Sequence, residues 1–330
     1  FEIEGLQRVA IEGNVDYPMR RLSQLLAAHP DDARLVRFQT QLMDLRAHRL
    51  GAAATGAPPP PPARGPLAAP PPIAGHEARS GQDFTTDTAE IPMIWIAPGT
   101  FLMSSTHGTD DDTQVTLTHG YWIGRTELTQ AQWRELMDNI SVPSLFKGSD
   151  RPVERVSWVL ATEFCRKLDE REHAAGRVPA GYEYTLPTEA QWEYACRAGT
   201  TGSFAGDIDE MGWTVANSGG QTHPVAQKRP NAWGLYDMHG NVGEWCVDGL
   251  HGYPGGAVND LRGDYSGPSA GTFRIVRGGS WGANLGECRS GFRSWAALGA
   301  NYASVGFRVA LAPVRDPARA DPAVGGATAK

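Results

Sequence analysis

The sequence predicts an α+β protein in which a small all-α module precedes a larger domain of irregular build, and three observations predict it. Residues 1–50 carry apolar residues at helical spacing. Residues 51–85 are dominated by Ala, Pro and Gly. Residues 86–313 alternate short strand-like runs with loops rich in Gly, Asn, Asp and Pro, and they hold all ten tryptophans, whose large rings can fix long loops.

The first 50 residues predict a group of short helices. Gly13 and Asn14 separate a first apolar stripe from a second, and Pro18 suits the first turn of the second helix. The stripes of the three helices consist of Ile3, Leu6 and Val9, then Met19, Leu22, Leu25 and Leu26, then Leu35, Phe38, Leu42 and Leu45. This segment resembles the effector-associated adaptor domains of bacterial conflict systems, which implies a conflict-system effector as its partner. A plain helical hairpin, or a fragment of a larger helical domain, is the alternative.

Residues 51–85 predict a linker, because proline runs favour extended polyproline II and act as a semi-rigid spacer. Residues 314–330 are predicted to be a flexible tail.

The sequence of the main domain predicts two helices. One follows Ser157, and the other opens at Thr188 as its N-cap, with the acidic Glu189 in its first turn.

Composition excludes several classes of protein. A net charge of −7 and a pI near 5.7 argue against a nucleic-acid partner. No stretch approaches the roughly 18 apolar residues of a membrane span. None of the four cysteines lies in a CxxC pair, so zinc has no support, and we expect reduced thiols in the cytoplasm. Because the chain starts at Phe1, a signal peptide removed upstream, and hence secretion, stays open.

Six blocks run in order through the main domain: "MIWIAPGTFLMSS", "YWIGRTELTQAQW", "RPVERVSW", "YTLPTEAQWEYACRAGT", "NAWGLYDMHGNVGEW" and "VRGGSW…CRSGFR…GFRVA". Together they resemble the formylglycine-generating enzyme (sulfatase-modifying factor) family over about residues 88–313. The resemblance implies a C-type-lectin-like core elaborated with long loops.

The enzymes of this family hold copper(I) on two cysteines of the last block and oxidise a cysteine of a protein substrate. Aligned on "RGGSW", the second cysteine falls on Cys288 and the first on Ala283. Copper(I) prefers thiolates, and a methyl group cannot replace one. The resemblance therefore implies no copper centre. The alternative is an oxidase or related enzyme acting on protein cysteine, with Cys288 as its catalytic residue.

The counterparts of two other cysteines form disulfides in the secreted enzymes of the family. In this chain the positions of the disulfide partners of Cys165 and Cys196 hold Val309 and Trp295, which cannot form disulfides. This supports a reducing compartment. A further branch, the ergothioneine-type sulfoxide synthases, adds a helical domain with a three-histidine iron site. Residues 1–50 hold only two histidines, so the sequence does not favour that branch.

The same fold and block order occur in the variable proteins of diversity-generating retroelements, whose last segment displays a ligand-binding surface. Residues 282–304 of this chain have that layout and offer a mixture of aromatic and polar side chains suited to recognition. The resemblance thus implies a protein that binds a macromolecule or a small molecule. The alternative is that Trp295 and Phe292 are core residues. The predicted ligand-binding residues are Ala283, Asn284, Leu285, Glu287, Phe292, Trp295, Leu298, Asn301, Tyr302 and Ser304.

The block "GLYDMHGNVGEW" corresponds to a calcium-binding loop of the family. By position, the resemblance implies structural calcium held by the side chains of Asp237 and Glu244 and by the carbonyls of Gly240 and Val242. Oxygen ligands at short spacing on a glycine-bent loop suit Ca²⁺. The alternative is a metal-free turn built by His239 and Asn241. We expect the arginines of the last blocks to pin loops rather than to contact ligand, namely Arg277, Arg289, Arg293 and Arg308.

Overall fold

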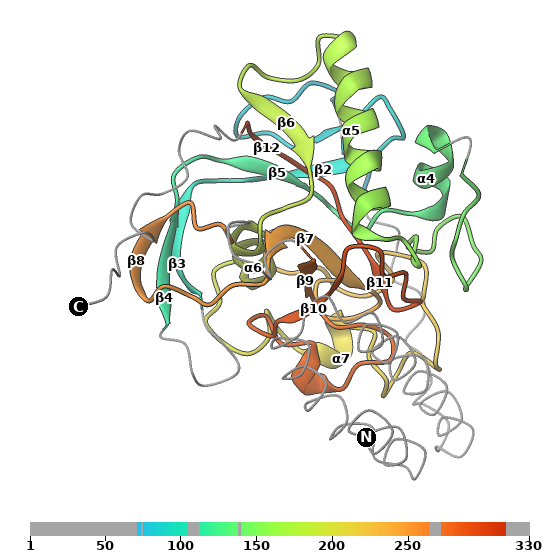
Figure 1. The fold of residues 1–330 in the computed structure, drawn as a ribbon, viewed down its shortest axis with the longest axis vertical. Helices are drawn as coiled ribbons and strands as arrows, with labels where there is room; N and C mark the ends of the chain where they lie inside the picture. The colour runs from blue at the N-terminus through green and yellow to red at the C-terminus, as the bar shows by residue number, and fades with distance from the viewer. Residues whose placement is uncertain (1–70, 74, 104–111, 138–139, 264–271, 315–330) are drawn as a thin grey trace.

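The computed structural model describes residues 71–73, 75–103, 112–137, 140–263 and 272–314 (Figure 1). The predicted helical module of residues 1–50, most of the predicted linker, and residues 315–330 of the tail lie outside the described residues. The rest is an α+β domain, as predicted, with three small sheets and four helices among the described residues.

The largest sheet has five strands and joins the two ends of the domain. Its C-terminal strand β12 pairs antiparallel with β5 on one side and with β6 on the other. The strands lie in the order β1 (Phe84–Thr85), β2 (Pro92–Ile96), β5 (Tyr121–Gly124), β12 (Ala310–Pro313) and β6 (Tyr182–Thr185). All four residues of β5 are buried, which fits its place in the interior of the sheet.

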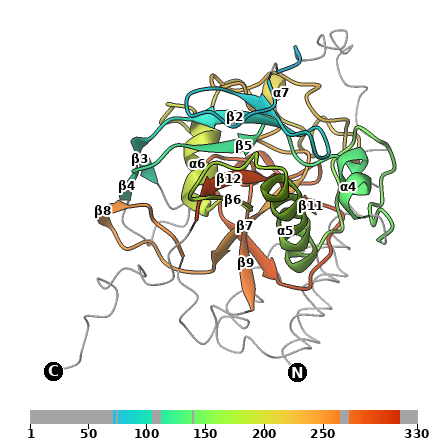
Figure 2. The ribbon, with the colours of Figure 1, turned by 90° about the horizontal axis from the view of Figure 1, so that it is seen from above.

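Two further sheets complete the domain. The central one has the order β10 (Ser294–Ala297), β9 (Phe273–Arg277), β7 (Gly243–Gly249) and β11 (Val305–Gly306). Every residue of β7 and β9 is buried. The third sheet consists of β3 (Gly99–Met103), β4 (Thr113–Leu117) and β8 (Gly256–Asn259). Figure 1 and Figure 2 show this third sheet at the opposite side of the domain from α4 and α5.

The four helices are α4 (Gln130–Leu136), α5 (Trp158–Ala174), α6 (Glu189–Arg197) and α7 (Ile208–Met211). The two helices predicted from sequence are α5 and α6. Their N-caps are confirmed, because the hydroxyls of Ser157 and Thr188 accept hydrogen bonds from backbone N–H groups of the first turn. Within the described ranges, no helix is both long and apolar enough to cross a membrane.

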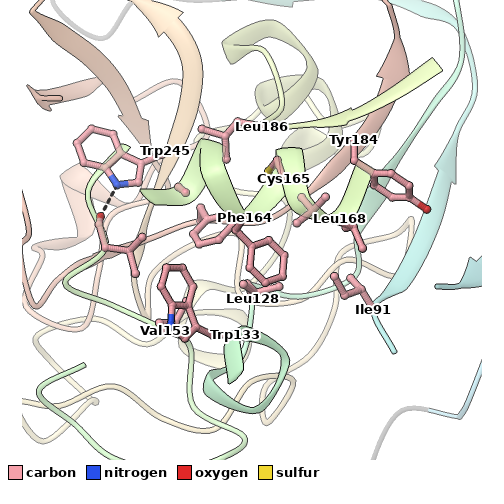
Figure 3. Close-up of a cluster of buried hydrophobic side chains, with 14 of the residues drawn as sticks. Ile91, Leu128, Trp133, Val153, Phe164, Cys165, Leu168, Tyr184, Leu186 and Trp245 are labelled. Atoms are coloured by element: carbon pink, nitrogen blue, oxygen red, sulfur yellow. Dashed lines mark hydrogen bonds between the residues drawn. The ribbon is translucent and has the colours of Figure 1, made fainter. Parts of the chain in front are cut away.

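Large aromatic rings build the core between α5 and the sheets (Figure 3). Trp133 of α4 stacks on Phe164 of α5 with ring centroids 6.0 Å apart, and Phe307 meets both rings edge-on. Trp245 of β7 donates its indole N–H to the carbonyl of Val156 at 2.8 Å, the dashed line of Figure 3. Trp245 thereby ties β7 to the loop before α5, whereas the indole N–H of Trp133 has no hydrogen-bond partner in the described structure.

The folded domain begins earlier than residue 86. Phe84 lies in β1, is buried, and meets Trp122 edge-on with centroids 5.8 Å apart. The indole N–H of Trp122 also donates to the carbonyl of Gln82 at 2.8 Å. The last part of the predicted linker therefore belongs to the domain, because a single phenylalanine after a polar stretch gives the chain an apolar anchor.

Candidate functional site

The last segment leaves β9 through two glycines in the left-handed region, Gly278 and Gly279. A Cβ on Gly279 would lie 2.5 Å from the sulfur of Cys288, so this close approach requires glycine. The following Trp281 is buried and donates its indole N–H to the carbonyl of Ala303 at 3.0 Å. The chain then forms a short 3₁₀ helix, η2 (Leu285–Glu287).

The structure divides the predicted ligand-binding residues into three groups. Asn284, Leu285 and Asn301 are exposed, and Leu285 shows 46% of its surface to solvent. Five are half-buried, namely Glu287, Phe292, Trp295, Leu298 and Ser304. Two are buried, Ala283 at 8% exposure and Tyr302 at 3%. The exposed residues therefore come from η2 and from the loop before β11.

Ala283 and Tyr302, which the sequence predicted to contact a ligand, do not present their side chains at the surface of the structure. Tyr302 packs into the main hydrophobic core, and its carbonyl accepts the N–H of Arg155 at 3.0 Å. The backbone of Ala283 is held on both sides, by the N–H of Val215 and the carbonyl of Ser280. Contacts with residues far along the chain thus draw both side chains inward.

Two of the half-buried residues, Glu287 and Trp295, belong to the framework of the last segment. The Glu287 carboxylate accepts the backbone N–H of Asn284 at 2.9 Å and so caps η2. Trp295 lies on β10, the outer strand of its sheet, opposite Ile275. Trp295 thus lies within β10 and Leu298 follows it directly, whereas Leu285 lies in η2 and Asn284 is the N-cap of η2.

Cys288 is completely buried, and this burial raises the pKa of its thiol to about 12. Its carbonyl accepts the Nδ1–H of His239 at 2.8 Å, and the Nε2 of His239 accepts the N–H of Ala205 at 3.1 Å. Burial lowers the pKa of His239 to about 4, so the imidazole is neutral and both nitrogens are engaged. The thiol is therefore protonated at neutral pH, with its neighbouring histidine already committed to backbone groups.

The predicted calcium loop is buried, and Arg308 holds one of its carboxylates. Arg308 Nε and Nη2 donate to the two oxygens of Glu244 at 2.6 and 2.7 Å. The indole N–H of Trp192 donates to the same carboxylate at 2.7 Å. A calcium ion bound by Glu244 would have to compete with this bidentate pair.

The surroundings of Asp237 favour a cation. One oxygen of Asp237 accepts the N–H of Ala226 at 2.8 Å, and the other is buried without a hydrogen-bond partner in the described structure. Burial raises the pKa of Asp237 to about 6. Its neighbour Glu127, for which the sequence predicted no role, is buried as well, and it accepts the backbone N–H of Val242 and the side-chain N–H of Asn241.

Arg308 is hydrogen-bonded to Glu244, and its charge also acts on Glu127 and Asp237. Burial, and then the charges of Asp237 and Glu244, hold the pKa of Glu127 well above its usual range. The excess negative charge calls for bound protons or for a metal ion. No set of three or more His, Cys, Asp or Glu side chains in the described part of the chain is arranged to hold a metal. The predicted calcium ligand set is therefore incomplete in this arrangement: one oxygen of Asp237 has no hydrogen-bond partner, but Glu244 could bind calcium only if Arg308 moved.

The arginines of the last blocks pin loops, as predicted, at three of the four positions. Arg293 binds both oxygens of Glu189 at 2.6 and 2.7 Å. Arg277 is paired with Glu193, and Arg308 with Glu244. These three arginines are buried, so their charges are neutralised inside the domain. Arg289 differs, because its side chain is half-buried and donates only to the carbonyl of Gly286.

Comparison with known proteins agrees with the six sequence blocks. Residues 81–313 match the family model described as the sulfatase-modifying factor enzyme 1-like domain. The chain is 32% identical over 257 residues to the chaperone protein LppX of Paenibacillus barcinonensis, which covers 63% of this chain and 84% of that protein. It is 32% identical over 181 residues to the formylglycine-generating enzyme of Streptomyces coelicolor, which covers 49% of this chain and 52% of the enzyme. The chain thus spans about half the length of that enzyme.

Among solved structures, Treponema denticola variable protein 1 is similar with a TM-score of 0.61 and 30% sequence identity, covering 70% of this chain and 99% of that chain. This likeness confirms the predicted C-type-lectin-like fold and the resemblance to a variable protein. With the family model matched over most of its described residues, the chain belongs to the family of sulfatase-modifying factor enzyme 1-like domains.

Proposed function

We propose that this chain is a ligand-binding member of its family, without a copper oxidase centre, and that exposed residues between 284 and 301 contact the ligand. One observation carries the proposal. Ala283 stands where the family resemblance places the first thiol, and Cys288, at the second place, is buried and protonated. Copper(I) held by two thiolates has only one sulfur available there.

The exposed chemistry suits recognition of a polypeptide. Leu285 offers apolar surface, and the exposed Asn284 and Asn301 offer amide donors and acceptors. Two similarities support a binding role. One relative is named a chaperone protein, and one similar structure is a variable protein.

The test compares capture of chemically cross-linked partners from a lysate of the source organism by the wild type and by Leu285→Asp. Leu102→Asp is the matched control, because Leu102 of β3 is 51% exposed, close to the 46% of Leu285, and lies in another sheet. We expect Leu285→Asp to lose partners that Leu102→Asp retains, with the melting temperature unchanged in both. Equal capture by the two variants contradicts the proposed surface.

A cysteine-directed oxidase is the second candidate, favoured by the retained Cys288 and by the similarity to formylglycine-generating enzyme. It requires tight one-to-one binding of copper(I) and oxygen-dependent oxidation of a cysteine peptide. Both activities should be absent from the wild type if the ligand-binding proposal is right.

A further inference from the structure

A loop outside the last segment completes the surface around η2. In residues 142–151 the ring of Phe146 meets Trp281 edge-on, with ring centroids 5.4 Å apart. A few residues further, the backbone N–H of Arg155 donates to the carbonyl of Tyr302 at 3.0 Å. The loop, Trp281 and the stretch before β11 are therefore joined, although they lie more than 100 residues apart in sequence.

Hydrogen bonds fix this loop in place. The N–H of Phe146 donates to a carboxylate oxygen of Glu154 at 2.9 Å, and the side-chain amide of Gln130 donates to the Phe146 carbonyl at 2.7 Å. Lys147 Nζ donates to the carbonyl of Val142 at 3.0 Å. On this fixed loop the side chain of Leu145 remains 49% exposed. A partner that binds here does not have to order the loop first.

Four basic side chains border the loop and η2: Lys147, Arg151, Arg155 and Arg289. In the described structure, the side chains of Lys147, Arg151 and Arg289 donate hydrogen bonds to neutral oxygens of Val142, Thr222, Gln221 and Gly286. Across the described ranges, no ion pair joins any of the four to a carboxylate. We call the exposed or half-buried side chains of Leu145, Lys147, Arg151, Arg155, Leu285 and Arg289 the basic face.

The acids near this face offset its charge only in part. Asp150 is exposed on the same loop. Glu154 is buried beneath the loop, where burial raises its pKa to about 7, although Arg155 and Lys147 act to lower it. Glu287 is engaged in capping η2. In these segments the exposed or half-buried basic side chains therefore outnumber the acidic ones, although the chain as a whole has a net charge of −7.

We propose that the basic face binds an acidic polypeptide segment that carries apolar side chains. This inference rests on the proposed function and names the chemical class of its ligand. The four cations attract carboxylates, and the exposed Leu145 and Leu285 offer contacts for apolar side chains. A nucleic acid fits less well, because Trp281 is buried and cannot stack on bases.

The test measures fluorescence anisotropy of three short labelled peptides of equal length with the full chain. One peptide alternates Glu with Leu, the second Lys with Leu, and the third Glu with Ser. The double variant Lys147→Glu/Arg155→Glu removes the central cations. The matched control Arg134→Glu/Arg171→Glu makes the same charge change at exposed positions of α4 and α5.

We expect the wild type to bind the Glu–Leu peptide about tenfold more tightly than either other peptide, and the double variant to lose about that factor while the control pair retains it. Equal affinity for the three peptides, the same loss in the control pair, or tighter binding of single-stranded DNA overturns the inference. Should the double variant unfold, Lys147→Ala and Leu145→Ala, at exposed positions, provide the same comparison. Leu285→Asp and Lys147→Glu/Arg155→Glu are also compared in the capture assay. If only Leu285→Asp loses partners, the proposed function stands and this inference is refuted.

Discussion

The carboxyl group of Glu154 makes the stability of the domain depend on pH near neutrality. Its side chain is completely buried, one oxygen accepts the N–H of Phe146 at 2.9 Å, and the other has no hydrogen-bond partner in the described structure. Burial raises the pKa of Glu154 from 4.5 to about 7, although hydrogen bonds from the backbone of Phe146 and Leu145 oppose this rise. The folded state therefore favours the protonated acid.

The sign of the effect follows from the direction of this change. A raised pKa in the folded state gives stability that is fully present below the unfolded pKa of 4.5 and is lost as the pH rises through about 7. A difference of one unit between the folded and unfolded pKa corresponds to about 1.4 kcal/mol. The whole contribution of Glu154 is then about 3 kcal/mol, of which about 2.5 kcal/mol is lost between about pH 5 and pH 8.

Glu154→Gln removes the titrating group while keeping a side-chain oxygen for the N–H of Phe146. Urea unfolding followed by tryptophan fluorescence at about pH 5 and pH 8 should show the wild type losing about 2.5 kcal/mol more than this variant. Glu127 and Asp237 titrate in both proteins, so their effects cancel in the comparison. Glu135→Gln, at an exposed position of α4, should behave like the wild type. An identical pH dependence in the wild type and Glu154→Gln would refute the reasoning.

Four other outcomes are expected. Tyr302→Ala should cost about 3–5 kcal/mol of unfolding free energy, whereas Trp295→Ala on the edge strand should leave the melting temperature nearly unchanged; similar losses would place both rings in the core. The wild type should not compete with a chelator for copper(I), and Ala283→Cys should gain that ability; tight binding by the wild type contradicts this. Calcium at 100 times its dissociation constant should stabilise the fold by about 2.7 kcal/mol, and Asp237→Asn should remove the effect without breaking the Glu244–Arg308 pair; a melting curve insensitive to chelator would mean a metal-free turn. Limited proteolysis should cut within residues 51–70 and leave a stable domain, and resistance to protease there would count against a linker.

The parts of the structure that were predictable depend on local sequence. Ser157 and Thr188 cap helices through bonds to residues three positions later, so the pattern contains both partners. The six ordered blocks likewise fix the fold, because each block is a contiguous stretch. The pinning role of Arg277 and Arg293 was also predictable from the place of the last block in that fold.

The parts that were not predictable depend on contacts between distant residues. Tyr302 is buried because Arg155, almost 150 positions earlier, holds its carbonyl. Glu127 and Glu154 are isolated acids in polar stretches and read like solvated residues, and only the tertiary fold removes them from water. No periodic pattern marks such a carboxylate, since its burial is set by loops from elsewhere in the chain. The same holds for the loop of Phe146 beneath the basic face.

The buried ion pairs hold the framework of the last segment through residues other than its exposed ones. Arg277, Arg293 and Arg308 hold the last segment through Glu189, Glu193 and Glu244, all inside the domain. Removing one partner of such a pair costs about 3–5 kcal/mol, so these positions tolerate little change. The exposed Leu285 and Asn301 take no part in this network, and substitutions at such positions usually change stability by about 0.5 kcal/mol or less. Selection can therefore alter the proposed ligand surface while the framework beneath it stays constant.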